Sequence, residues 1–282
     1  MSPRTILITG ASRGLGKALA LRFAAAGWQV AATMLDESEA PELAGRPGIT
    51  TFLLDVADVG SIERGVAAVI ARFGTIDLLV NNAGYGSFAV VEAASEAQIR
   101  RLYATNALGP VFVTRAVIPH MRRRGTGILM FVSSSIASLS APLHGMYAAC
   151  KWATTGFAEG LVYEMQSIGV QVKVVAPGAM ATSYFTHTDD RLDGVPAEYA
   201  EGIARMKAGL EQALVGAPTS EQVAAEIFAA ATDGTDQVHY LVTEQARQMV
   251  GYRREVGDEI WLQQAVQAFT QSQTVAAIGR QG

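Results

Sequence analysis

Thr9-Gly-Ala-Ser-Arg-Gly-Leu-Gly16 is the stretch that decides the fold, because it joins a short apolar run to a segment of helical periodicity. Glycines at this junction allow a tight turn and let backbone N–H groups approach a pyrophosphate at the start of the helix. A purely structural turn between strand and helix would also use glycine. A P-loop does not fit, since Ala11 stands where its first glycine belongs and Ala18 replaces the hydroxyl residue that binds magnesium.

Apolar runs recur along the chain, and helical patterns fill most of the gaps between them. The runs that we expect to form strands are 5–9, 30–33, 50–54, 76–80, 127–132, 170–175 and 238–242. Alternation of strand and helix predicts a mostly parallel sheet covered on both faces. We therefore expect a doubly wound, Rossmann-like α/β fold in three α/β/α layers.

Length and composition favour one domain. The chain has 282 residues, of which 50% are hydrophobic and 17% are charged, whereas about 25% are charged in an average soluble protein. No long linker or internal repeat divides it, so we expect a single domain over 1–282. Loops beyond the C-terminal strand ends border the cleft of such sheets. We therefore expect 183–217 to form a helical substrate lid and 244–282 a helical extension.

Charge and cysteine content argue against several classes of protein. The net charge is 22 − 26 = −4, which gives nucleic acid no electrostatic footprint. Cys150 is the single cysteine, and the four histidines lack metal-ligand spacing, so we expect no disulfide and no metal site. The N-terminus lacks the pattern of a signal peptide, and no apolar run reaches the roughly 18 residues of a membrane helix. A cytoplasmic protein fits these observations best.

Further motifs follow the glycine stretch at the expected strand ends. They are Asp55-Val56, Asn81-Asn-Ala-Gly84, Asn106, Ser134, Tyr147-x-x-x-Lys151 and Pro177-Gly178. Together with T-G-x-x-x-G-x-G at 9–16, the set resembles the short-chain dehydrogenase/reductase family, in its compact oxidoreductase branch, over roughly residues 4–182. The resemblance implies hydride transfer between a nicotinamide cofactor and a carbonyl or alcohol.

Tyr147 and Lys151 are four residues apart, so the helix expected over 145–168 places them on one face. An ammonium beside a phenol favours its phenolate and makes it more useful for acid–base chemistry. A packed tyrosine and a solvated lysine on an amphipathic helix would give the same spacing. The family resemblance implies that Tyr147 is the general acid in reduction and the general base in oxidation, and that Ser134 hydrogen-bonds the substrate oxygen. It also implies that Lys151 binds the nicotinamide ribose and that Asn106 holds a water in a proton relay.

The resemblance also implies a set of residues that bind the cofactor. They are Gly10, Ser12, Arg13, Gly14, Leu15 and Gly16 at the pyrophosphate, Asp55 and Val56 at the adenine, Asn82, Ala83 and Gly84 along the crevice, and Tyr147, Lys151, Pro177, Gly178 and Thr182 at the nicotinamide. Some of these positions have simpler explanations. Asn81, the first residue of the stretch that contains Asn82 to Gly84, would suit a tie between strands, and Thr182 would suit a helix cap.

The second strand ends where an acidic residue would hold the ribose of NAD, and Met34 stands there instead. Arg13 offers a guanidinium suited to a 2′-phosphate, so NADP is the expected cofactor. Two neighbouring residues count against NADP. Leu35 stands where many NADP-preferring relatives carry a basic residue, and the Asp36 carboxylate would repel a phosphate. NAD stays open as the alternative.

A small-molecule carbonyl or alcohol is the expected substrate. The lengths of the lid and the extension resemble those of relatives acting on bulky apolar alcohols and ketones. Residues that would suit an apolar pocket, or ordinary packing, are Phe88, Leu139, Met146, Met180, Tyr184 and Phe185. The family resemblance favours a homodimer or homotetramer, and a cofactor-binding sensor without turnover is the alternative to an enzyme.

Overall fold

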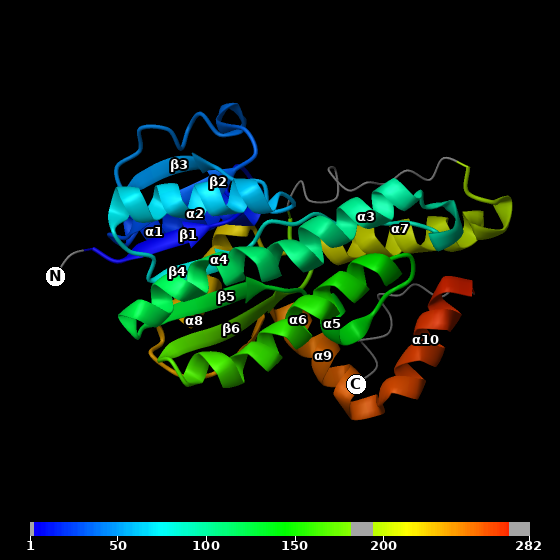
Figure 1. Ribbon diagram of the computed structural model, residues 1–282. Coiled ribbons are helices and arrows are strands. Elements are labelled where there is room, and N and C mark those ends of the chain that lie inside the picture. The colour runs from blue at the N-terminus through cyan, green and yellow to red at the C-terminus, as the bar shows by residue number, and fades with distance from the viewer. Residues whose placement is uncertain (1–2, 182–193, 271–282) are drawn as a thin grey trace.

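Seven parallel strands form one sheet in the order β3-β2-β1-β4-β5-β6-β7 (Figure 1). The computed structural model describes residues 3–181 and 194–270 of the chain. Its strands are β1 (Thr5–Ile8), β2 (Gln29–Met34), β3 (Ile49–Leu53), β4 (Leu78–Asn81), β5 (Gly127–Val132), β6 (Val170–Pro177) and β7 (His239–Val242). Each apolar run in the sequence forms one of these strands, which confirms the predicted doubly wound α/β fold.

Helices connect the strands and continue beyond the last one. The α-helices are α1 (Gly14–Ala25), α2 (Val59–Phe73), α3 (Glu96–Tyr103), α4 (Gly109–Arg124), α5 (Ile136–Leu139), α6 (Gly145–Gln166), α7 (Ala200–Leu214), α8 (Ser220–Thr232), α9 (Glu244–Val256) and α10 (Asp258–Thr270). Shorter turns are η1 (Glu37–Glu39), η2 (Val91–Ala93), the π-helical turn η3 (Ala104–Leu108) and η5 (Ala197–Tyr199). Within the described residues, η5 and α7 fall in the region expected to be the lid, and α9 and α10 in the expected extension.

Each face of the sheet has its own apolar core. On one face α1 and α8 pack through side chains such as Phe23 and Ile227 onto Ile8 and its neighbours. On the other face α2, α4 and α6 cover a second core that includes Leu7 and Leu129, and Figure 1 views the sheet from this side. Strands covered on both faces need apolar residues at successive positions. The strands are apolar runs in the sequence because helices cover both faces of the sheet.

The topology gathers the motifs at one edge of the sheet. β1 lies between β2 and β4, and the strand order reverses there. In open α/β sheets, ligands bind outside the carboxyl ends of the strands beside such a switch point. The glycine stretch follows β1, and Asn82 to Gly84 follow β4. The functional site is therefore expected at this edge.

A buried ion pair joins Lys173 of β6 to Asp233, the residue that follows α8. Lys173 is 1% exposed, and its Nζ donates to the Asp233 carboxylate (2.7 Å), to the Tyr240 hydroxyl (2.9 Å) and to the Ala230 carbonyl (2.9 Å). Burial alone would raise the pKa of Asp233. Hydrogen bonds from Lys173, Tyr240 and the Thr235 N–H oppose this and hold that pKa far below its usual range.

Asp233→Asn is expected to lower the free energy of unfolding by about 3 kcal/mol, because it leaves the Lys173 charge buried without a counter-charge. The Asp233 side chain is 27% exposed, so the expected loss lies at the low end of the range for breaking a buried ion pair. Urea unfolding measures the loss, with Asp236→Asn as the matched control. Because the pKa of Asp233 is depressed, the stabilisation is present at neutral pH, and the difference between the two variants shrinks as pH falls below about 4. Equal stability of both variants at neutral pH would contradict the assignment.

Candidate functional site

Tyr147 and Lys151 lie side by side on α6, the helix that the sequence predicted to end two residues later, at 168. Both side chains are buried, with 8% and 6% exposure, and the Lys151 Nζ lies 5.8 Å from the centre of the Tyr147 ring. The ammonium donates a hydrogen bond to the Val132 carbonyl at the end of β5 (2.9 Å). Burial lowers the pKa of Lys151 to about 8, an effect that the Cys150 thiol partly opposes. A buried ammonium therefore faces a buried phenol.

The serines after β5 have separate partners. Ser133 is buried, and its hydroxyl bonds to the Thr155 hydroxyl (2.8 Å) and donates to the Lys151 carbonyl (3.3 Å), so it ties β5 to α6. Ser135 donates its N–H to the Pro177 carbonyl (2.8 Å). Ser134 is half-buried, and its hydroxyl accepts the Ile136 N–H (3.2 Å). Ser133 and Ser135 thus bond to other elements, α6 and β6, whereas the Ser134 hydroxyl bonds to a residue two positions away.

Asn106 lies in the π-helical turn η3, between α3 and α4. Its side-chain oxygen accepts the Tyr85 N–H (3.0 Å), and its side-chain nitrogen donates to the Tyr85 carbonyl (2.6 Å). A Cβ at Gly84 would lie 3.0 Å from the Asn106 Oδ1 and 3.8 Å from the Lys151 Nζ. Asn106 therefore holds the chain after β4 close to Lys151.

The glycine stretch is packed so closely that side chains are excluded. A Cβ at Gly16 would overlap the Gly10 carbonyl oxygen, and a Cβ at Gly10 would lie 2.8 Å from the Ala83 Cα. Gly10 and Gly14 also have positive φ values of 67° and 51°, which favour glycine. Of the neighbouring positions, Ser12 and Leu15 are buried.

Helix α1 begins at Gly14 with no side-chain cap and no acidic residue in its first turn. Its first N–H groups therefore point out of the helix as free donors at the positive end of the helix dipole. A pyrophosphate fits such a terminus, and the close glycines let it approach the backbone. The glycine stretch and the start of α1 thus form a cradle with the features that suit a pyrophosphate.

Asn82 supports the cradle from β4. Its side-chain nitrogen donates to the carbonyls of Thr9 (2.9 Å) and Gly10 (3.0 Å), while the Thr9 hydroxyl accepts the N–H groups of Asn82 and Ala83 (3.0 Å each). The side chain of Asn81 instead donates to the Thr114 hydroxyl of α4 (3.0 Å). Asn82 is therefore bonded to the glycine stretch, whereas Asn81 ties β4 to helix α4 and not, as considered from the sequence, to a neighbouring strand.

Other residues of the predicted cofactor site follow the carboxyl ends of β3 and β6. After β3, the Asp55 carboxylate accepts the Ala57 N–H (2.8 Å), and Val56 is buried against Gly109. After β6, the Gly178 N–H donates to the Thr243 hydroxyl (3.2 Å). Thr182 lies outside the described residues.

Arg13 is half-exposed beside the start of α1. Its side chain is 54% exposed, and its nearest carboxylate, that of Glu39 in η1, lies 3.8 Å away. Asp36 is exposed, and its carboxylate accepts the Ser38 N–H (2.8 Å) at the start of η1. Arg13 thus borders the end of β2 with only a loose ion pair.

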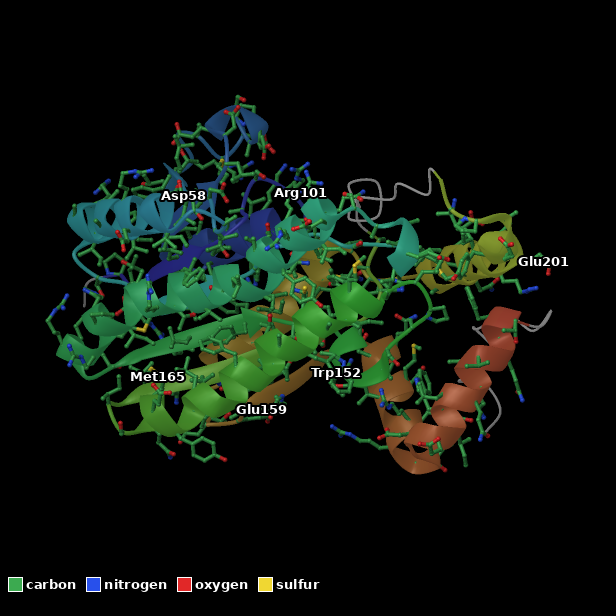
Figure 2. The ribbon with its side chains drawn as sticks, turned by 45° about the vertical axis from the view of Figure 1, so that its right-hand side comes forward. Asp58, Arg101, Trp152, Glu159, Met165 and Glu201 are labelled. Atoms are coloured by element: carbon green, nitrogen blue, oxygen red, sulfur yellow. The ribbon has the colours of Figure 1, made fainter. Side chains whose placement is uncertain are left out.

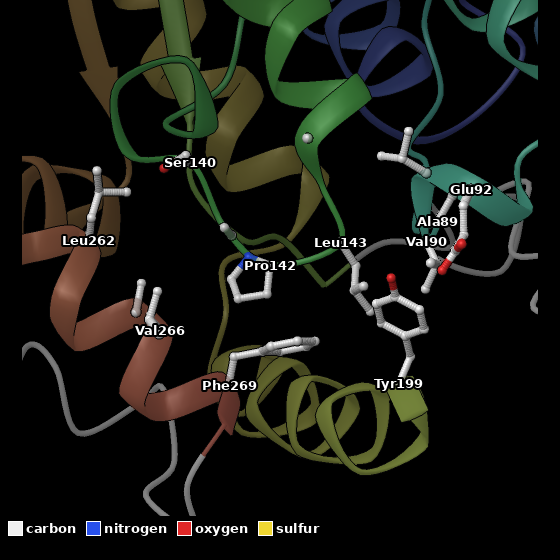
Figure 3. Close-up of a pocket in the computed structure, with 14 residues that line it drawn as sticks. Ala89, Val90, Glu92, Ser140, Pro142, Leu143, Tyr199, Leu262, Val266 and Phe269 are labelled. Atoms are coloured by element: carbon white, nitrogen blue, oxygen red, sulfur yellow. The ribbon is translucent and has the colours of Figure 1, made fainter. Parts of the chain in front are cut away.

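An apolar cavity of about 740 Å³ opens near the start of α6 (Figure 3). It is lined by Ala89, Val90, Val91, Glu92, Ser140, Ala141, Pro142, Leu143, Gly145, Tyr199, Leu262, Ala265, Val266 and Phe269. The loop before α6, the chain around η2, the end of η5 and one side of α10 are therefore its walls. Gly145 lies two residues before Tyr147, so the cavity adjoins the segment that carries the tyrosine.

Four of the residues suggested from the sequence for an apolar pocket are described by the structure, and they do not line this cavity. Phe88 packs against the His144 ring (4.2 Å between centres), and Leu139 packs with Val250 and Trp261. Met146 and Met180 belong to other packed clusters, while Tyr184 and Phe185 lie outside the described residues. Cys150 is buried, and burial raises the pKa of its thiol to about 11, as suits a packed residue.

The chain belongs to the short-chain dehydrogenase/reductase family, since the model of the family described as "short chain dehydrogenase" matches residues 4–193. It is similar to a 3-ketodihydrosphingosine reductase of Bacteroides thetaiotaomicron, 34% identical over 73% of this chain and 75% of that protein. Among solved structures it resembles a short-chain dehydrogenase of Streptomyces avermitilis, with 30% identity, a TM-score of 0.82 and coverage of 96% of this chain and 99% of that one. A structure of ElxO with NADP bound is 26% identical, with a TM-score of 0.70 over 85% of this chain and 96% of that one.

The protein is accordingly an oxidoreductase of the nicotinamide-dependent kind. Residues 3–181 and 194–270 contain no helix long and apolar enough to cross a membrane. In the same part of the chain, no three histidine, cysteine or acidic side chains gather as metal ligands would.

Proposed function

We propose that this protein interconverts a ketone or aldehyde and the corresponding alcohol, with Tyr147 as the general acid in reduction and the general base in oxidation. The observation that carries the proposal is the buried pair of Tyr147 and Lys151 beside the start of the loop that contains Ser134. The relative named as a 3-ketodihydrosphingosine reductase supports the choice of a keto group.

Two side chains act on the reacting oxygen, and a third acts through Tyr147. The Tyr147 hydroxyl donates its proton to the carbonyl oxygen, or takes one from the alcohol. Ser134 donates a hydrogen bond to the same oxygen. Lys151 carries the positive charge that favours the phenolate of Tyr147. The geometry of Asn106 supports a positioning role near Lys151, and its part in a proton relay stays a prediction.

The residues proposed to hold the cofactor are Gly10, Ser12, Arg13, Gly14, Leu15, Gly16, Asp55, Val56, Asn82, Ala83, Gly84, Tyr147, Lys151, Pro177, Gly178 and Thr182. A bound nicotinamide supplies or accepts the hydride. The uncapped start of α1 supports the pyrophosphate position. We propose NADP over NAD, because Arg13 is exposed with only a loose partner and is available for a phosphate.

Arg13→Ala is expected to weaken NADPH binding about 10- to 100-fold, the value of one charge-assisted hydrogen bond, and to leave NADH binding unchanged. Fluorescence titration of both cofactors measures this. Arg46→Ala removes an exposed cation that lies before the amino end of β3, away from the proposed site, and serves as the control. Equal losses for both cofactors would contradict a contact between Arg13 and a 2′-phosphate.

The first experiment mixes the purified protein with NADPH or NADH and follows cofactor absorbance against small and bulky ketones and aldehydes. Oxidation of one cofactor by a carbonyl class supports the proposal. Turnover with NADH alone would favour an NAD-dependent dehydrogenase of the same fold. Tight cofactor binding without turnover of any carbonyl would favour a cofactor sensor.

We also propose a homodimer or homotetramer in the cytoplasm. The outer side of α6 supports assembly, since Tyr163 is 82% exposed and Trp152 and Glu159 lie along the same helix (Figure 2). The single thiol, Cys150, is buried, which suits a reducing compartment. Sedimentation equilibrium measures the assembly state, and a monomer at micromolar concentration would contradict the proposal.

A further inference from the structure

We propose that the apolar cavity beside α10 receives the part of the substrate that does not react, and that this part is bulky, apolar and uncharged. The inference rests on the proposed function and names its substrate class. A volume of about 740 Å³ falls within the range of about 300–1,000 Å³ for pockets that bind drug-sized molecules. Small carbonyl compounds would leave most of it filled with water.

The cavity is joined to the site through the loop between Ser134 and Tyr147. Residues 140–143 of this loop and Gly145, the first residue of α6, form one wall. The Leu143 carbonyl accepts the Ala89 N–H (3.0 Å), so the wall from this loop is fixed to the wall that precedes η2. A molecule that fills the cavity therefore lies next to the loop that leads into Tyr147.

Leu143 has a backbone conformation that leucine rarely adopts, with φ at +62°, and Ser140 has φ at +55°. Strained conformations of this kind persist where the surrounding structure fixes them, and they cluster at binding sites. In Figure 3 the side chains of Leu143, Tyr199 and Phe269 face the same space. The strained backbone thus places a leucine side chain at the wall of the cavity.

Helix α10 supplies the opposite wall with an apolar stripe. Leu262, Ala265, Val266 and Phe269 follow one another at i, i+3, i+4 and i+7, which puts them on one side of the helix. Leu262 and Val266 are still 44% and 59% exposed there. Apolar side chains left exposed around a concavity are typical of a site that binds an apolar ligand.

Helices α9 and α10 are both hydrogen-bonded to α5, the short helix that follows Ser134. The Trp261 indole N–H donates to the Leu139 carbonyl (2.7 Å), and the Arg253 guanidinium donates to the Ser138 carbonyl (2.7 Å). Phe269 packs on α7, where a Cβ at Gly202 would overlap its ring. The cavity is therefore a formed feature of the fold.

Among the described residues that line the cavity, Glu92 is the charged one. The Tyr199 hydroxyl is hydrogen-bonded to Glu92, and this bond raises the pKa of Tyr199. Figure 3 shows the two side chains facing each other at one wall. A carboxylate in an otherwise apolar lining repels an anionic ligand, so uncharged substrates are favoured over carboxylates of the same shape.

The test fills the cavity without touching the residues proposed for catalysis. Val266→Trp places an indole in the cavity, whereas Ile260→Trp adds the same group to an exposed position of α10 outside it. Calorimetry with an uncharged polycyclic ketone measures binding, and turnover is measured with that ketone and with a small cyclic ketone. We expect Val266→Trp to lower binding and kcat/KM for the polycyclic ketone at least about 10-fold. The small ketone and the Ile260→Trp control should be little affected.

The charge is tested with a keto acid and its methyl ester. The wild type is expected to prefer the ester at low salt, and Glu92→Gln should reduce that preference, while Glu96→Gln on the exposed side of α3 should not. Equal effects of Val266→Trp and Ile260→Trp, or no binding of the polycyclic ketone, would overturn the cavity assignment. Normal binding with loss on Val266→Trp, but no turnover of any carbonyl, would instead support the cavity and contradict the proposed reaction.

Discussion

Tyr147→Phe is expected to lower kcat by about 100- to 10,000-fold, the contribution of a positioned general acid or base. The change removes one oxygen and keeps the ring, which packs beside Lys151 and lies 6.3 Å from the His144 ring centre. Folding and cofactor binding should therefore be nearly unchanged. Steady-state turnover with a reducible ketone measures the loss, and fluorescence titration measures NADPH binding.

Tyr163→Phe is the matched control for this variant, because Tyr163 lies on the same helix but is 82% exposed. Its turnover should equal that of the wild type. Turnover of Tyr147→Phe at the wild-type rate would contradict the role proposed for the hydroxyl. A loss of cofactor binding as large as the loss of turnover would assign Tyr147 to binding alone.

Lys151→Met is expected to lower kcat by about 100-fold or more at neutral pH, since it removes the charge that favours the phenolate. The pH dependence gives a sharper result. Burial lowers the pKa of Lys151 to about 8, so its ammonium is present below that pH and is lost as pH rises through it. The wild-type value of kcat/KM for NADPH, which reports groups of the free enzyme, should therefore fall above pH 8.

Lys151→Arg separates the charge from other effects, because a guanidinium stays protonated throughout this pH range. Its activity at neutral pH should be reduced by the changed shape, but the decline above pH 8 should disappear. Lys207→Met, which removes an exposed lysine of α7, is the control and should keep the wild-type profile. A decline at pH 8 that persists in Lys151→Arg would show that another group titrates.

The fold was readable from the sequence because parallel strands covered on both faces need uninterrupted apolar residues. The run at 127–132 agrees with β5 at both ends, and the weaker run at 238–242 still gives β7. The proximity of Tyr147 and Lys151 followed from helical spacing alone. Local periodicity was therefore sufficient to predict the features that depend on residues close together in the chain.

Contacts between distant segments were not predictable in this way. Lys173 stands in an apolar run and gives no sign of its partner Asp233, which lies 60 residues further on. The cavity likewise depends on the bond between Trp261 and Leu139, which are 122 residues apart, and on the positive φ of Leu143. For this reason the sequence suggested Phe88 and Met146 for the pocket, whereas the lining includes Leu262 and Val266.

Leu139 and Trp261 are 122 residues apart in the chain, and this separation sets an order of events during synthesis. A ribosome that has released the chain through α6 has already delivered the glycine stretch, Ser134, Tyr147 and Lys151. Trp261 emerges 261 − 166 = 95 residues after the end of α6, which is at least about 5 seconds at 5–20 residues per second. The nascent protein therefore holds its proposed catalytic residues before it can enclose a substrate, and the growing chain passes through a stage in which the apolar wall of residues 140–143 faces water.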